Sequence, residues 1–158
     1  MIDILWGLKT QALFDVWSVE HVLSGFSVGW AAYEYNRGRI GDLLNGIENR
    51  IPGQKLRKVL GSYDVIVVLM LAYWWETLEH YLEAGLAGGA VAYWFQGVEF
   101  WGNRLITDPV MMILGYLIAR SFPRTVWPAR FLSLVWLVVH IFVFPHSMYL
   151  QQLFWPNS

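Results

Sequence analysis

Long runs of apolar residues alternate with short polar segments along this chain. Four of these runs approach the roughly 20 apolar residues that a helix needs to cross a bilayer core. They lie near residues 17–35, 63–83, 98–120 and 126–145. We therefore predict an all-α fold, a polytopic membrane bundle of about four transmembrane helices. The sequence shows no internal repeat or low-complexity tract, and we expect a single integral membrane domain over residues 1–158.

Two connections between these runs have patterns of their own. Between the first and second runs, apolar residues recur every three or four positions among charged residues, which predicts an amphipathic connecting helix on the cytoplasmic membrane surface. Its apolar positions are Ile40, Leu43, Leu44, Ile47 and Ile51. Between the second and third runs, residues 84–97 are apolar but too short to span a bilayer, and glycines interrupt them. We expect a re-entrant or interfacial segment there.

Glycine and proline positions predict how two of the spanning helices pack and bend. Gly25 and Gly29 are four residues apart, so both lie on one face of the first helix, where another helix can approach closely. In the third run, Pro109 follows Asp108, a residue type that caps helix N-termini. We therefore predict that the third helix is kinked at Pro109, or restarts there with Asp108 as its N-cap.

The composition favours a membrane protein and excludes several other classes. Hydrophobic residues make up 56% of the chain, the mean hydropathy is +0.40 and there are ten tryptophans, more than a soluble domain of this size usually needs. Tryptophans near the span ends are typical of an aromatic belt at the membrane interface. The net charge of -1 gives no electrostatic footprint for nucleic acid. Because cysteine is absent, any metal site needs histidine and carboxylate ligands.

The distribution of arginine and lysine predicts the orientation, because basic residues that flank a span stay preferentially on the cytoplasmic side. Most of them lie between the first and second runs or around the connection between the third and fourth: Arg37, Arg39, Arg50, Lys55, Arg57, Lys58, Arg120, Arg124 and Arg130. Lys9 and Arg104 remain for the opposite side. Both termini are then non-cytoplasmic.

In this orientation the first and third helices begin on the non-cytoplasmic side, and the second and fourth helices end there. Their polar ends must therefore meet. These ends carry Asp15, Glu20, His21, Glu76, Glu79, His80, Glu83, Glu99, Asn103, Arg104, Asp108, His140 and His146. An ionisable side chain in a spanning helix costs free energy unless it faces a cavity or a partner. We therefore predict a shared polar pocket.

The first interpretation of this pocket is a metal site. Glu76 and His80 are four residues apart on one helix face, and Glu79 lies beside them. Imidazole and carboxylate ligands suit zinc, manganese or iron, so the predicted cofactor is a divalent metal. The candidate ligands are His21, Glu76, Glu79, His80 and His140.

Two other interpretations of the pocket remain open. In metal-free acid–base chemistry, crowded carboxylates raise one another's pKa, so that a glutamate could act as the acid and His21 or His80 as the base. In a purely structural arrangement, Arg104 pairs with Asp108 on its own helix or with a glutamate of the second helix. Asn103 and Arg104 could also bind an anionic head group of a substrate. The candidate catalytic residues are Glu76, Glu79, His80, His21 and Asp108.

Three segments carry a family resemblance: DVWSVEHVLSGF from residue 15, WWETLEH from residue 74 and DPVMMILGYLIAR from residue 108. They resemble the bacterial inner-membrane proteins of domain-of-unknown-function family 2585, over a region from about Leu5 to Trp155. The resemblance implies the same membrane architecture, although Ser24 and His80 stand where that family has a histidine and an asparagine. A weaker likeness of plan extends to VanZ-like membrane proteins. The positions that the resemblance marks are Asp15, His21, Glu76, Glu79, Asp108 and, for packing, Gly115.

The sequence thus predicts a small integral membrane protein with a polar pocket of histidine and carboxylate side chains on its non-cytoplasmic side. We expect an enzyme or binding protein, metal-dependent or acid–base, for a lipid-like or head-group ligand. The alternative is a non-catalytic accessory or scaffold subunit of a larger membrane complex. The expected partners are the lipid bilayer and either such a complex or further copies of the chain.

Overall fold

The computed structural model describes residues 2–45, 53–154 and 156. These residues form helices joined by short turns and contain no β-strand, apart from one backbone bridge between Trp6 and Phe14. The prediction of an all-α fold is therefore confirmed for the described part of the chain. The helices are α1 (Ile2–Leu5), α2 (Val16–Ser24), α3 (Trp30–Asn45), α4 (Gly53–Glu83), α5 (Gly89–Phe95), α6 (Asp108–Ser121), α7 (Val126–Val138) and α8 (Tyr149–Phe154).

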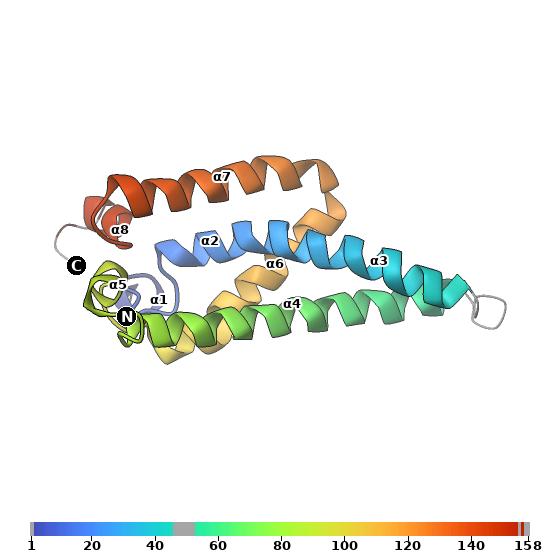
Figure 1. Ribbon diagram of the computed structural model, residues 1–158, viewed down its shortest axis with the longest axis horizontal. Coiled ribbons are helices and arrows are strands. Elements are labelled where there is room, and N and C mark those ends of the chain that lie inside the picture. The colour runs from blue at the N-terminus through green and yellow to red at the C-terminus, as the bar shows by residue number, and fades with distance from the viewer. Residues whose placement is uncertain (1, 46–52, 155, 157–158) are drawn as a thin grey trace.

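Four long helical segments run back and forth along the molecule (Figure 1). The first consists of α2 and α3, which are joined by the π-helical turn Gly25–Gly29, and α4 returns beside it. The third is α6, which crosses the others obliquely, and α7 then runs back in the opposite direction. As a result, α1, α5 and α8 lie at one end of the molecule (left in Figure 1), where the first and third segments begin and the second and fourth end.

Two of the predicted helix boundaries are wrong. The first helix does not stop at residue 35, because α3 continues through Asn45; residues 40–45 therefore belong to it and not to a separate surface helix. The rest of that predicted amphipathic helix, residues 46–52, lies outside the described residues. The second helix begins at Gly53, well before residue 63. Amphipathic and spanning segments share the same helical period, so the pattern could not separate one from the other.

The segment 84–97 contains a short helix at the end of the bundle. After α4 ends at Glu83, a turn with Gly85 and Gly88 in the left-handed region leads into the seven residues of α5. The indole N–H of Trp94 donates to the carbonyl of His140, and the backbone N–H of Ser147 donates to the carbonyl of Trp94. These two bonds hold α5 against the end of the fourth segment, so this segment closes one end of the molecule.

The third helix passes through Pro109 without restarting. The π-helical turn Asn103–Thr107 leads directly into α6, and Asp108 has ordinary helical backbone angles. Of the two predicted alternatives, the restart with Asp108 as N-cap is therefore wrong, and the helix is continuous through Pro109. Pro109 has no N–H to offer the carbonyl of Leu105, and the hydroxyl of Tyr73 in α4 donates to that carbonyl at 2.9 Å. This bond from a neighbouring helix compensates for the missing backbone bond.

A close crossing of the first and third segments forms the centre of the fold. A Cβ on Gly25 would lie 2.1 Å from the carbonyl oxygen of Met112, and one on Gly115 would lie 2.0 Å from that of Val22. A Cβ on Gly29 would likewise lie 2.5 Å from the Cβ of Tyr116. The predicted packing role of Gly25 and Gly29 is therefore confirmed. The buried core beside this crossing consists of Ala32, Val68, Ala72, Met112 and Tyr116. Because Gly25 and Gly115 have no side chains, the two segments pack closely, and this brings the polar residues of α2 and α6 near one another.

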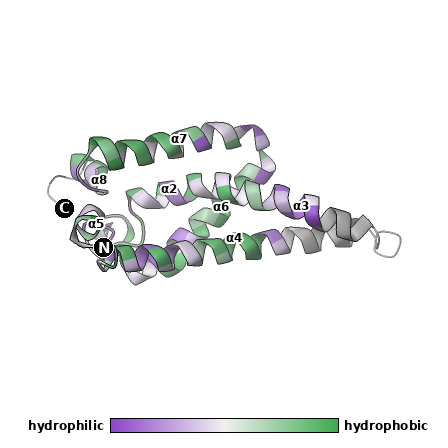
Figure 2. Cartoon of the chain, viewed as in Figure 1, coloured by the Kyte–Doolittle hydropathy of each residue, from purple (hydrophilic) through white to green (hydrophobic). Residues whose placement is uncertain are grey.

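Much of the apolar surface of these helices is exposed, most clearly on α7. Figure 2 shows α7 as largely hydrophobic; its Phe131 and Leu134 are 67% and 60% exposed, and Phe142 in the π-helical turn that follows, Val139–Val143, is 79% exposed. Among the described residues, one helix is long and apolar enough to cross a membrane: Pro123–Val143, of which 22% is buried in the molecule. The fourth predicted span is thus supported by length and composition.

Candidate functional site

The start of α2 links the first segment to the third. Asp15 caps α2 by accepting hydrogen bonds from the backbone N–H groups of Trp17 and Ser18. The hydroxyl of Ser18 accepts from the Asp15 N–H and donates to Oδ1 of Asp108, at 3.1 Å. Burial raises the pKa of the Asp15 carboxyl to about 6, although its two backbone bonds oppose the shift. This capping arrangement fixes the register in which α2 presents its next turn to α6.

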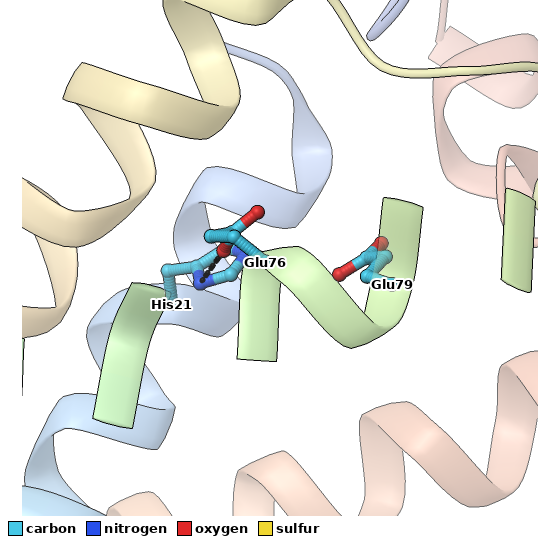
Figure 3. A group of neighbouring side chains, drawn as sticks. All are labelled: His21, Glu76 and Glu79. Atoms are coloured by element: carbon cyan, nitrogen blue, oxygen red, sulfur yellow. Dashed lines mark ion pairs between the residues drawn. The ribbon is translucent and has the colours of Figure 1, made fainter. Parts of the chain in front are cut away.

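His21, one turn further along α2, lies between two carboxylates. Its Nδ1 is 3.6 Å from Oε1 of Glu76 in α4, and its Nε2 is 3.3 Å from Oδ2 of Asp108 in α6. All three residues are buried. Figure 3 shows His21 and Glu76 turned toward each other, with Glu79 one turn further along α4. Of the four segments predicted to meet here, the first three do so, through His21.

Glu76 is the least satisfied of these side chains. It is only 1% exposed, and neither of its carboxylate oxygens has a hydrogen-bond partner. A buried, uncompensated carboxylate costs several kcal/mol, so such a group usually binds a cation or a proton. The position of Glu76 beside an imidazole therefore points to a binding function.

Glu99 and Asp108 form a second set of carboxylates near Glu76, and a hydrogen bond holds one oxygen of each. The side-chain amide of Asn103 donates to Oε1 of Glu99 at 2.8 Å, and Ser18 donates to Oδ1 of Asp108. The remaining oxygens, Oε2 of Glu99 and Oδ2 of Asp108, have no hydrogen-bond partner. Each carboxylate is therefore fixed in orientation while one oxygen stays available.

Next to this cluster is an ion-pair network around Glu83 at the end of α4. Both Lys9 and Arg104 bond to the Glu83 carboxylate, which also accepts the backbone N–H of Glu99 at 3.0 Å. Arg104 thus pairs with a glutamate of the second segment, one of the partners expected for a structural role, and not with Asp108. Its Nε is 3.7 Å from Glu99. The two cations neutralise Glu83 and leave the carboxylates around His21 without a close cation among the described residues.

The structure does not bring every candidate residue into the cluster. His80 is exposed, and its Nδ1 lies 2.9 Å from Arg104. His140 is buried among Trp17, Trp94 and Trp136, and its Nδ1 bonds to the carbonyl of Trp136. Both histidines therefore lie outside the carboxylate cluster, and the fourth segment contributes no ligand to it.

Two groups of side chains have the composition and spacing of metal sites. The first is His21, Glu76 and Glu79; the second is Glu76, Glu99 and Asp108. Within each group, one ligand atom per residue lies within 4.8 Å of the others. Imidazole with carboxylates suits zinc, manganese or iron, and three carboxylates suit harder ions such as manganese or magnesium. Sequence reasoning placed Glu99 and Glu83 among the polar helix ends but gave neither a role.

An apolar cavity of about 550 Å³ opens beside the first group. His21, Glu79 and Glu20 line it on one side. The rest of its wall is mostly aromatic and aliphatic: Trp17, Val28, Leu71, Trp74, Trp75, Trp94, Phe95, Met112, Leu137 and Ile141. Its volume is in the range of small-molecule sites. The cavity therefore joins a polar wall to a space suited to a hydrocarbon chain.

No family model, curated protein or solved structure matches this chain. The function must therefore be inferred from the cluster and the cavity themselves.

Proposed function

We propose that the chain is a multi-pass membrane protein that binds a divalent metal ion at His21, Glu76 and Glu79 and acts on a lipid-like substrate in the adjoining cavity. The observation that carries the proposal is Glu76, whose buried carboxylate has no hydrogen-bond partner and lies beside an imidazole. A divalent ion bound there would neutralise the carboxylate and orient the ring of His21.

The exposed apolar surface of three helical segments supports the proposed membrane bundle. Large apolar residues are exposed along three segments: Ile66, Met70 and Leu71 in α4, Val110, Leu114 and Leu117 in α6, and Phe131, Leu132 and Leu134 in α7. Soluble monomers rarely expose apolar patches of this extent. Lipid chains are the solvent that would cover them at least cost. A polar cluster at one end would then lie near the non-cytoplasmic interface.

The cavity supports a substrate with one polar and one apolar part. A head group carrying phosphate or ester oxygens would meet the metal at His21 and Glu79, while its chain would lie against Trp17, Leu71 and Leu137. A divalent ion supplies two kinds of chemistry at such a point: it polarises a substrate oxygen, and it lowers the pKa of a bound water. We therefore propose metal-assisted hydrolysis or transfer at the head group.

The family resemblance and the alternative of a scaffold subunit both bear on this proposal. We retain the resemblance to family 2585 as part of it, because the polar positions that the resemblance marks, Asp15, His21, Glu76, Glu79 and Asp108, belong to one cluster. An accessory or scaffold subunit would need neither the cavity nor the unpartnered carboxylates. Those two features make a binding or catalytic function the better explanation.

The metal site can be tested by substituting Glu76. The full-length protein, purified in a mild detergent and stripped with a chelator, is titrated with Mn²⁺ or Zn²⁺, and bound metal is measured after removal of the excess. We expect at least one ion per wild-type chain and at least a roughly tenfold loss of affinity in Glu76→Gln. Glu20→Gln is the matched control, because Glu20 is a buried glutamate of the same cavity that lies outside both ligand groups.

The same variant also shows whether the protein remains folded. A neutral amide is cheaper to bury than an uncompensated carboxylate, so metal-free Glu76→Gln is expected to unfold at a temperature no lower than that of the metal-free wild type. If the wild type binds no metal, or if Glu76→Gln binds it as tightly as the wild type, the metal site is refuted. The carboxylates would then be held as protonated acids.

A further inference from the structure

The two possible ligand groups share Glu76. The first group adds His21 in α2 and Glu79 in α4, and the second adds Glu99 and Asp108 from the start of the third segment. Glu76 has two carboxylate oxygens, both buried and both without a hydrogen-bond partner. Oε1 is the oxygen near His21, which leaves Oε2 for a second ligand. A carboxylate in this position can bind one ion through each oxygen.

The fully ionised cluster carries enough negative charge for two divalent ions. Six carboxylates gather here, those of Asp15, Glu76, Glu79, Glu83, Glu99 and Asp108. Among the described residues, the cations paired with them are Lys9 and Arg104. When all six carboxylates are ionised, their six negative charges and the two positive charges leave an excess of four negative charges. Two divalent ions supply four positive charges.

The second ligand group is also preorganised in the way metal ligands usually are. Asn103 holds one oxygen of Glu99 and Ser18 holds one oxygen of Asp108, and among the described residues the other oxygen of each carboxylate makes only longer ion-pair contacts, with Arg104 and His21. Hydrogen bonds of this kind orient ligands and set metal affinity.

We infer that the cluster is a dinuclear centre in which Glu76 bridges two divalent cations. The first ion binds His21, Glu76 and Glu79, as in the proposed function on which this inference rests. The second binds Glu76, Glu99 and Asp108 through oxygen ligands alone, which suits manganese or magnesium. Paired ions in such centres lie about 3.5–4 Å apart and stabilise the attacking and leaving oxygens of a displacement reaction. This pairing favours a phosphoester of a lipid-like molecule as the substrate class.

Mn²⁺ is the probe for the test, because its electron paramagnetic resonance spectrum separates isolated ions from exchange-coupled pairs. The metal-stripped, full-length protein in detergent is loaded with Mn²⁺, and bound manganese and the spectrum are measured on the same sample. We expect two ions per wild-type chain with a coupled signal. Asp108→Asn and Glu99→Gln are expected to keep one ion with an isolated signal, and Glu20→Gln is expected to keep both ions.

Ser18→Ala provides a milder variant that leaves every ligand in place. Loss of the hydroxyl that orients Asp108 should lower the affinity for the second ion by about 10- to 100-fold and leave the affinity for the first ion unchanged. One ion per wild-type chain with an isolated signal would overturn the dinuclear centre and leave the proposed metal site intact. No bound ion would overturn both, and equal loss of the two ions in Ser18→Ala would show that the second group is not a separate site.

Discussion

At the residue scale, Asp15 shows how burial and hydrogen bonding compete at one carboxyl group. One oxygen caps α2, and the other, Oδ2, has no hydrogen-bond partner. Burial outweighs the two backbone bonds and raises the pKa to about 6 in the folded protein. The folded state therefore holds a proton on Asp15 at pH values where the unfolded chain, with a pKa of about 3.9, has released it. Stability from this protonated form is full below about pH 4 and is lost as the pH rises toward 6.

We therefore predict a pH-dependent difference between the wild type and Asp15→Asn. Asparagine keeps the cap but does not ionise, so the free energy of unfolding of the wild type should fall relative to that of the variant between about pH 4 and pH 7, by at most about 3 kcal/mol. Unfolding is followed by tryptophan fluorescence in detergent with a chelator present, so that bound metal does not contribute. A difference that stays constant over this range would show that Asp15 ionises normally.

At the scale of single elements, the crossing of α2 and α6 decides the geometry of the site. The backbones approach closely at Gly25 and Gly115. A Cβ on either glycine would overlap a backbone carbonyl oxygen of the other segment, at 2.1 and 2.0 Å. Ser18 and His21 reach Asp108 only because this crossing holds the two segments together. Packing of small residues therefore positions the polar cluster one to two turns away.

Gly115→Ala should accordingly destabilise the fold. The added Cβ meets the carbonyl oxygen of Val22, which is backbone and can move only with α2, so we expect a loss of about 1–3 kcal/mol in unfolding free energy together with weaker metal binding. Gly38→Ala is the matched control, since Gly38 is also helical but nothing lies within 4 Å of its missing Cβ. There the change should stabilise α3 by roughly 0.5–1 kcal/mol. Equal stability of the two variants in thermal unfolding would contradict the close crossing.

At the scale of the whole molecule, the proposed membrane orientation follows from helices that share their ends. The third segment from Asn103 to Ser121 is roughly 28 Å long at 1.5 Å per residue, close to the thickness of a bilayer core. Its start lies at the end of the molecule that carries α1, α5 and α8, and its other end leads into α7 (Figure 1). The polar cluster and both terminal helices then lie toward one face of the membrane.

Because the chain contains no cysteine, single introduced cysteines report this orientation directly. Leu86 and Ser121 are exposed residues near opposite ends of the proposed spans. We predict that a membrane-impermeant maleimide labels Leu86→Cys in intact bacterial spheroplasts and labels Ser121→Cys only after permeabilisation, because the basic connections remain cytoplasmic. The unmodified protein controls for background labelling. Labelling of Ser121→Cys alone would reverse the orientation, and labelling of both in intact cells would exclude a span between them.

The sequence by itself determined the class of fold, the direction of each segment and the end at which polar residues gather. Apolar runs of spanning length predict helices because a helix satisfies its own backbone hydrogen bonds, and alternate directions then fix which ends meet. Small residues at Gly25 and Gly29 likewise indicated the face of the first helix that packs most closely. These inferences depend on the spacing of apolar and small residues and on the length of each apolar run, both of which are visible in the sequence alone.

Only the tertiary structure decided which polar side chains meet. Helical spacing placed both His80 and Glu79 beside Glu76. In the folded protein α4 is oriented so that Glu76 is buried, whereas His80 is exposed next to Arg104. The roles of Glu99 and Glu83 depend on contacts between segments far apart in sequence, set by the glycine crossing and by the pairing of Glu83 with Lys9 and Arg104. Such contacts arise from packing between helices, and the periodicity of one helix carries no information about its rotation against another.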